Sequence, residues 1–366
     1  MPTDSTLTAS GSDLEPDTRR ILRLAIATSL SLWVSQVGDW SMSFIAPVLT
    51  MFLLALPVPA PSLKQGIGFV MALAGSVYAG ILLLPLFETA RGAGIGVFTV
   101  ALFYTFYFSA RGGSPVLGAF MTVGLAILAA VGSVNIDAVL AVAEGLSVNA
   151  AIGMAFVWVG HALLPEPPPS PIATAPKPPA TKPDPVRATR TALRSMLIVY
   201  PVAMLFFLSS ASASWVVVMV KVASMGQQVG LDQSRTVGRS LIASTVIGGI
   251  AAIIAWQILR AWPTLIIYTL IIAGASLFFG RRIFKGAGMH AQGSMWSYGF
   301  LTMIVVLAPA VMDGPGADGA SSAFYTRLGL FLVIALYGSA TVAVFDAFWP
   351  SRSGQADETV VRAGAN

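Results

Sequence analysis

Twelve runs of mostly apolar residues, each close to 20 residues long, account for most of this chain. A helix needs about 20 apolar residues to cross the roughly 30 Å hydrocarbon core of a bilayer. The runs are continuous rather than alternating in polarity, which excludes a membrane β-barrel. We therefore predict an all-α polytopic membrane protein with about 12 transmembrane helices, near residues 20–37, 40–57, 66–86, 93–110, 115–134, 141–164, 191–209, 211–228, 236–259, 261–280, 291–312 and 328–349.

The composition excludes several function classes. Of the 366 residues, 56% are hydrophobic and only 10% are charged, which excludes a cytosolic enzyme, a disordered protein and a nucleic-acid binder. The chain has no cysteine and two histidines, His161 and His290. It therefore lacks a disulfide framework, a thiolate nucleophile and a His-rich metal site, and we expect no metal and no cofactor.

The basic residues predict the orientation of the spans. With the N-terminus in the cytoplasm, 18 of the 21 Lys and Arg side chains fall on the inner side, and only Arg91, Arg260 and Arg327 fall outside. Lys221 is counted on the inner side, although it could lie within a span. Because cytoplasmic loops carry an excess of Lys and Arg, this asymmetry supports twelve spans with both termini in the cytoplasm.

Short motifs recur about 171 to 185 residues apart, which indicates a duplicated chain. The pattern TRxxLR precedes the first span at residues 18–23 and the seventh at 189–194. Span 6 ends in HALLP at 161–165, and span 12 ends in DAFWP at 346–350. An even number of spans per repeat gives both halves one orientation, so we expect a pseudo-twofold axis along the membrane normal.

These features predict five segments. They are a polar cytoplasmic tail, a first six-helix membrane repeat, a Pro-rich cytoplasmic linker, a second six-helix repeat and a second cytoplasmic tail, at residues 1–18, 19–164, 165–188, 189–350 and 351–366. The Pro-rich composition of the linker is typical of an extended spacer.

Three short segments carry a resemblance to a known family: WSMSFIAP at 40–47, RTVG at 235–238 and residues 244–249. With them, the chain resembles the fusaric-acid-resistance (FUSC) and aromatic acid exporter superfamily, in its short bacterial branch. Many members carry a large cytosolic domain between the halves, where this chain has only the linker. The resemblance implies proton-driven export of small, often aromatic, organic acids across a Gram-negative inner membrane, together with a periplasmic adaptor protein.

Lys221 is the strongest candidate for binding an anionic substrate. It lies about ten residues, or about 15 Å, into the predicted span 211–228, where a lysine costs about 2.5–3.5 kcal/mol. In the repeat it aligns with Pro47, a proline interruption of span 2, and interrupted segments at matching places indicate a transporter's binding site. Alternatively, the span ends early and Lys221 reaches the inner surface. Gln227 and Gln228, at the inner end of span 8, are weaker candidates.

Asp346 and His161 are candidates for coupling transport to protons. They occupy matching places near the inner ends of spans 12 and 6, and Asp, Glu and His side chains inside bundles commonly relay protons. Alternatively, both reach interfacial water and mark span ends. Glu144 is a third candidate; with Asp137 it could line the outer mouth or simply be a solvated helix start, where negative charge is favourable.

Small residues at helical spacing predict close helix packing on spans 3 and 9. They are Gly75, Ser76 and Gly80 in span 3, and Ser244, Gly248 and Ala252 in span 9.

These observations favour a proton-coupled exporter of small organic anions rather than an enzyme. Gly314, Gly316 and Gly319 spell GxGxxG, but they lie in a loop without a preceding strand, and no phosphate-binding GxxxxGK[ST] motif is present. The expected partners are the anion, protons, membrane lipid, a periplasmic adaptor and a second copy of the chain. Three alternatives remain open: a passive anion channel, an integral-membrane enzyme acting on lipid-linked substrates, and a structural membrane subunit.

Overall fold

A computed structural model describes residues 15–131, 136–166, 184–208, 221–223, 225–226, 236–286, 288–314 and 319–348. Helices make up 86% of the structure, so the all-α prediction is confirmed. The described helices are α1 (Pro16–Val37), α2 (Ile45–Ala55), α3 (Leu63–Leu82), α4 (Leu84–Thr89), α5 (Arg91–Ala110), α6 (Pro115–Val131), α7 (Ile136–Leu163), α8 (Pro185–Leu208), α10 (Thr236–Ala261), α11 (Leu265–Ile283), α12 (Gly293–Met312) and α13 (Ala320–Phe348). Strands β1 (Phe284–Lys285) and β2 (Gly288–Met289) pair antiparallel between α11 and α12.

Several of these helices are long and apolar enough to cross a membrane, so the chain is a multi-pass membrane protein. Within the described residues there are seven: Leu63–Phe87, Arg91–Ala110, Val139–Leu163, Val237–Ala261, Leu265–Ile283, Gly293–Met312 and Ala320–Phe345. Ile45–Ala55 and Val116–Leu125 are shorter apolar helices. Helices α1 and α8 are also long, but each begins with three arginines.

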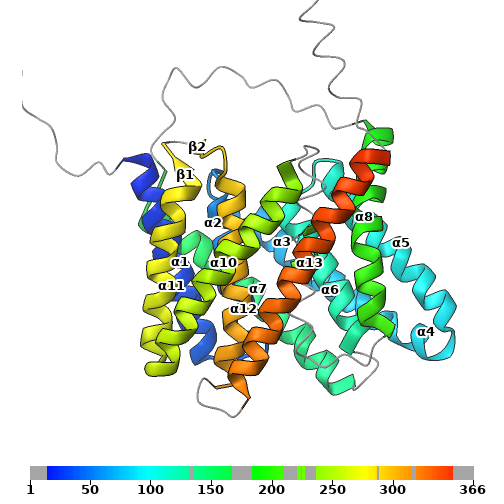
Figure 1. The fold of residues 1–366 in the computed structure, drawn as a ribbon, viewed down its shortest axis with the longest axis horizontal. Helices are drawn as coiled ribbons and strands as arrows, with labels where there is room; N and C mark the ends of the chain where they lie inside the picture. Colours follow the sequence, from blue (N-terminus) through cyan, green and yellow to red (C-terminus); the bar gives the residue numbers. More distant parts are fainter. Residues whose placement is uncertain are drawn as a thin grey trace, which may run out of the picture.

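The helices run side by side, and several helix ends lie at one edge of the bundle (Figure 1). The start of α1, the start of α8, the β1–β2 hairpin and the end of α13 all lie along the upper edge of the view. The α11–α12 hairpin carries Arg281, Arg282 and Lys285 to this edge. Several of the charges predicted to be cytoplasmic thus lie at one end of the bundle.

The helices pack in matching pairs. Helix α3 contacts α6 and α7 as α10 contacts α12 and α13, and α5 contacts α6 as α11 contacts α12. Between the two sets, α1 lies along α11, and α8 lies along α5. The buried faces of α7 and α13 also correspond at the predicted spacing of 185 residues: Leu146, Ala150 and Val157 are buried, and so are Phe331, Ala335 and Val342.

Helix α2 begins later than the sequence predicted. The span expected from residue 40 starts as a helix only at Ile45, because Asp39 and Met42 have φ angles of 48° and 59°, which break the helix before it. Pro47 is consequently in the first turn of α2 rather than an interruption within a helix. There its missing N–H costs nothing, because the first four N–H groups of a helix have no intrahelical partner.

Helix α7 holds this irregular segment in place. Asn149 Nδ2 donates hydrogen bonds to the backbone oxygens of Ser41, at 3.0 Å, and of Gly145, at 2.7 Å. A Cβ atom at Gly145 would overlap the Ser41 backbone oxygen, so only glycine allows the segment to approach α7 this closely. The late start of α2 therefore depends on contacts more than 100 residues away in sequence.

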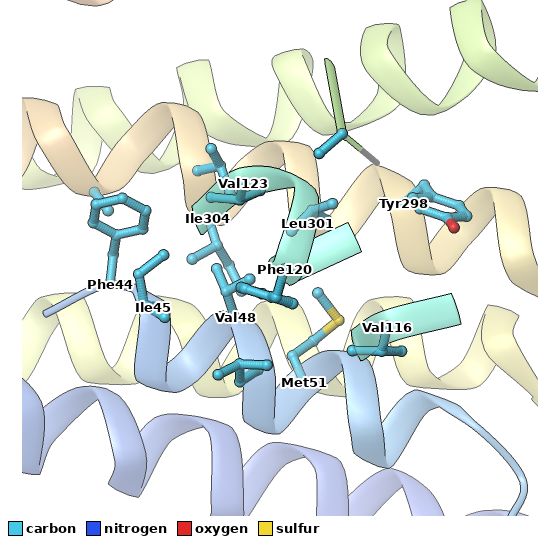
Figure 2. Packing of buried hydrophobic residues seen from close by; sticks show 14 of the residues in the cluster. Phe44, Ile45, Val48, Met51, Val116, Phe120, Val123, Tyr298, Leu301 and Ile304 are labelled. Carbon is cyan, nitrogen blue, oxygen red and sulfur yellow. The ribbon is translucent and has the colours of Figure 1, made fainter. Parts of the chain in front are cut away.

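Helix α12 lies at the centre of the bundle. Residues Ser297–Ala310 are all buried, because α2, α10, α11 and α13 pack around this helix. Figure 2 shows its residues Tyr298, Leu301 and Ile304 among apolar side chains of α2 (Phe44, Ile45, Val48 and Met51) and α6 (Val116, Phe120 and Val123). The core thus joins helices from both parts of the chain.

Of the two small-residue faces, the one on α10 makes the closer helix contact. A Cβ atom at Gly248 would overlap the backbone oxygen of Gly299 in α12, whereas one at Gly75 in α3 would meet nothing within 4 Å. The packing prediction is therefore wrong for Gly75 and right for Gly248.

We predict that Gly248→Ala destabilises the protein and that Gly274→Ala does not. Alanine favours a helix by about 1 kcal/mol over glycine, and a Cβ at Gly274 in α11 meets nothing within 4 Å. At Gly248 the overlap with α12 should outweigh this gain and lower the free energy of unfolding by about 1–3 kcal/mol. Thermal unfolding of the two purified variants in detergent measures the difference, and equal stabilities would contradict the packing described here.

Candidate functional site

Lys221 places its ammonium halfway along the central helix. Its side chain is only 1% exposed, and Nζ donates a hydrogen bond to Thr302 Oγ1 at 3.0 Å. Thr302 stands near the midpoint of α12 and itself donates to the backbone oxygen of Tyr298 at 2.9 Å. The ammonium thus lies beside the midpoint of a helix of membrane-spanning length.

The short described segment around Lys221 is wedged between several helices. Val222, Ala223 and Met225 are buried. A Cβ atom at Gly338 of α13 would overlap Met225, and one at Gly226 would overlap Val199 of α8 and Phe106 of α5. Lys221 therefore lies where helices from both parts of the chain meet, far from either end of the bundle.

The first part of the chain carries a buried threonine at the position that matches Thr302. The triplet Phe120-Met121-Thr122 in α6 matches Phe300-Leu301-Thr302 in α12, 180 residues later. Thr122 Oγ1 lies 3.0 Å from Thr105 Oγ1, and both side chains are buried. Sequence reasoning missed all three threonines; the shared Phe-x-Thr spacing was the one available signal.

The other predicted substrate-binding residues do not join Lys221 in the described structure. Pro47 lies in the buried first turn of α2, and the ring has no polar group to offer a substrate. Gln227 and Gln228 lie outside the described residues.

The predicted proton-coupling residues are dispersed. Asp346 is in the last turn of α13, but its side chain is outside the described part of the structure. His161 Nδ1 lies 2.9 Å from the backbone oxygen of Val157 in its own helix. Glu144 is exposed on α7. Among the described residues α7 and α13 do not pack along each other, so His161 and Asp346 do not sit on facing helices.

Arg20 and Arg23, which in the sequence serve only to predict orientation, hold Glu166 in a clamp where the start of α1 meets the end of α7. Arg20 Nε donates to Glu166 Oε1 at 2.8 Å, Arg23 Nη1 donates to Glu166 Oε2 at 2.8 Å, and Arg23 Nε donates to the backbone oxygen of Leu164 at 3.0 Å. Burial alone would raise the pKa of Glu166, but the hydrogen bonds and charges of the two arginines hold it below its usual value. The clamp fastens the end of α7 to the start of α1.

Comparison with known proteins finds one partial likeness. A family model described as "Protein of unknown function (DUF2955)" matches residues 20–159. This stretch begins in the first turn of α1 and ends just before the end of α7. No curated protein and no solved structure matches the chain.

We predict that Glu166→Gln destabilises the protein at neutral pH and that the loss shrinks in acid. The neutral amide cannot pair with two buried guanidinium groups, so the free energy of unfolding should fall by about 2 kcal/mol at pH 7. Because the folded-state pKa of Glu166 is below its usual value of 4.5, the clamp stabilises fully above about pH 4.5. The contribution is lost as the pH falls through the folded-state pKa, where the wild-type carboxylate is protonated too.

Thermal unfolding of both proteins in detergent between pH 3 and 7 tests this prediction. Glu15→Gln is the matched control, because Glu15 is exposed and makes no side-chain cap at the start of α1. A Glu166→Gln difference that is constant across this range would contradict the role assigned to the clamp.

Proposed function

We propose that this protein is a secondary transporter that exports small organic anions, most of them aromatic acids, across the bacterial inner membrane. The observation that carries the proposal is the ammonium of Lys221, enclosed at mid-depth of the bundle and hydrogen-bonded to the neutral hydroxyl of Thr302. An intramembrane lysine is costly to insert and usually marks a substrate or ion pathway. An anionic group is the ligand that complements it best.

The architecture proposed for this transporter is two six-helix repeats, as in the FUSC superfamily. Three observations support it: the helix pairings that occur twice, the matching buried faces of α7 and α13, and the family model whose match ends within α7. Binding sites at the interface of two repeats near the bilayer midplane are typical of secondary transporters, and Lys221 occupies such a place.

The enclosure of Lys221 favours a transporter over a passive channel. A channel offers a continuous water-filled path, whereas alternating access requires a state in which the site is closed from both sides. The 1% exposure of Lys221 corresponds to such a closed state. Counterflow of labelled substrate, measured with and without a proton gradient, separates the two functions, because a channel does not accumulate substrate against its gradient.

Aromatic side chains one helical turn from Thr302 support aromatic acids as substrates. Tyr298 lies one helical turn before Thr302, and its ring meets Phe52 of α2 edge to face, with 5.2 Å between the ring centroids. Aromatic rings favour such offset and edge-on contacts with other rings. A carboxylate on Lys221 would place the attached ring of the substrate within reach of this pair.

We predict that Lys221→Ala abolishes export and that Thr302→Val weakens it about tenfold or more. The alanine removes the counter-charge, and the valine removes a hydrogen bond to a charged group, which is worth about 1.5–3 kcal/mol. Lys221→Arg should rescue only in part, since a planar guanidinium replaces a compact charge. The assay is efflux of labelled benzoate, salicylate and 4-hydroxybenzoate from proteoliposomes.

The control for these variants is Lys64→Ala, because Lys64 is an exposed lysine at the start of α3. It should transport like the wild type. Normal transport of all three acids by Lys221→Ala, with normal insertion in the membrane, would exclude Lys221 from the substrate path.

The proposed orientation has both termini and the linker 165–188 in the cytoplasm. The chain has no cysteine, so single cysteines report sidedness directly. We predict that Ala175→Cys in the linker is protected from an impermeant maleimide in intact spheroplasts. Ser322→Cys, exposed near the start of α13, should be labelled. Labelling of position 175 from outside would reverse the orientation.

We further propose that Asp346 couples transport to the proton gradient, with His161 and Glu144 as further candidates. Asp346→Asn keeps the shape of the side chain but cannot titrate. The variant should lose gradient-driven accumulation of benzoate in vesicles and keep exchange of labelled for unlabelled benzoate. Gradient-driven transport that survives in Asp346→Asn would place the coupling elsewhere, with Glu144 tested next.

Work with a periplasmic adaptor and assembly with a second copy of the chain are part of the same proposal. They follow from the resemblance to the exporter superfamily. Co-purification of an adaptor encoded next to this chain, from cells treated with a cross-linker, tests the first. The mass of the detergent-solubilised complex tests the second.

A further inference from the structure

A second buried cation lies where the end of α12 meets the first turns of α13. Arg327 of α13 is only 6% exposed. Its Nη2 donates to Oδ2 of Asp313, the residue that follows α12, at 2.7 Å. Its Nε and Nη1 are buried and have no hydrogen-bond partner within the part of the chain that the structure describes. The sequence placed Arg327 in a loop before residue 328, but α13 begins at Ala320, so the side chain projects from within the helix.

The guanidinium of Arg327 has N–H groups that Asp313 does not engage. It carries five N–H groups in a fixed plane and no acceptor, and nearly all buried polar groups in proteins are hydrogen-bonded. Asp313 takes up only one nitrogen of Arg327. A carboxylate that displaced Asp313 could accept from Nη2 and one of the free nitrogens together, and such paired bonds are the strong form of arginine–carboxylate contact.

The same two helices connect Arg327 with Lys221. On α12, Thr302 binds Lys221 and Asp313 follows eleven residues later; on α13, Gly338 packs against Met225 and Arg327 precedes it by eleven residues. At 1.5 Å per residue, both helices separate the two cations by about 16 Å, or half of the hydrocarbon core. One cation lies at the midplane and the other near the outer end of the bundle in the proposed orientation.

The packing beside Arg327 offers another free donor. Phe324, one turn earlier on α13, stacks on Trp256 of α10 with the ring centroids 5.2 Å apart. Trp256 Nε1 is buried and also lacks a hydrogen-bond partner. Two side chains of the α10–α13 contact therefore keep unpaired N–H groups near an aromatic surface.

We infer that Arg327 forms a second anion-binding site, which receives the carboxylate of the substrate on the outer side of Lys221. Asp313 is the internal competitor that occupies the guanidinium while the site is empty. This inference rests on the proposed transport of organic anions. The inference adds one step to that transport: the anion passes from Lys221 to Arg327 before it reaches water.

The test counts benzoate sites by calorimetric titration of the full chain in lipid nanodiscs. Benzamide, the neutral analogue of benzoate, is the control ligand. We expect two benzoate sites in the wild type, one in Lys221→Ala and one in Arg327→Gln. In the Lys221→Ala background, Asp313→Asn should tighten the remaining site about tenfold, because it removes one charged competitor.

The outcomes separate this inference from the proposed function. If Arg327→Gln binds as many benzoates as the wild type while Lys221→Ala loses one, the second site is refuted and the central site stands. If Lys221→Ala loses none while Arg327→Gln loses one, the second site stands and the proposed role of Lys221 is wrong. If Arg327→Gln does not fold, two other results can refute the inference. One is that Asp313→Asn leaves the affinity of the remaining site for benzoate unchanged, and the other is that this site binds benzamide as tightly as benzoate.

Discussion

The packing of the helices around α12 encloses the hydrogen bond between Lys221 and Thr302. This hydrogen bond holds a positive charge against a helix that other helices enclose along most of its length. A charge at such a depth is tolerated only where the protein uses it, because the same volume filled by an apolar side chain would be cheaper to bury. Gly248 packs closely on α12 and Gly338 on Met225, next to the residues that enclose this hydrogen bond. This enclosed polar contact is the feature on which the proposed function rests.

The two parts of the chain share helix pairings but differ in the polar groups that they carry. The first part has a buried pair of neutral hydroxyls, Thr105 and Thr122, whereas in the second part the threonine that matches Thr122 accepts a hydrogen bond from the ammonium of Lys221. Each part also has an arginine–carboxylate contact in which the guanidinium is buried, at Glu166 in the first and at Asp313 in the second. The contacts lie at opposite ends of the bundle. The contact at Glu166 fastens α1 to α7, and Arg20 and Arg23 donate several hydrogen bonds to its carboxylate. The contact at Asp313 engages only one of the three nitrogens of the Arg327 guanidinium among the described residues. We interpret the first as structural and the second as functional.

Hydropathy predicted the positions of most helices. A long apolar run in lipid must form a helix, because only a helix hydrogen-bonds all the backbone groups of a single segment internally. Hydropathy misplaced the starts of α2 and α13. The break before Ile45 depends on backbone angles and on a hydrogen bond from Asn149, which no local apolar pattern records. The predicted last span began only near residue 328, whereas α13 begins at Ala320.

The depth of Lys221 could be predicted by counting residues along its span, because helical rise is constant. Its partner Thr302 could not, since the two residues are 81 positions apart and meet only when α12 packs at the centre. Arg20 and Arg23 were correctly seen as positive charges at a span end, but their pairing with Glu166 required knowing that α7 returns to the start of α1. Charge type and depth are local properties, whereas partners are properties of the assembled bundle.

The central claim is that an ammonium at position 221 is what the transported anion binds, and chemical replacement of that group tests it most directly. Lys221→Cys in this cysteine-free chain removes the charge, and 2-aminoethyl methanethiosulfonate restores an ammonium on a side chain of similar length. The account predicts that benzoate efflux is lost in Lys221→Cys, returns after aminoethylation, and does not return after the neutral methyl reagent. Efflux that persists in the unmodified variant, or that recovers equally with both reagents, would contradict it.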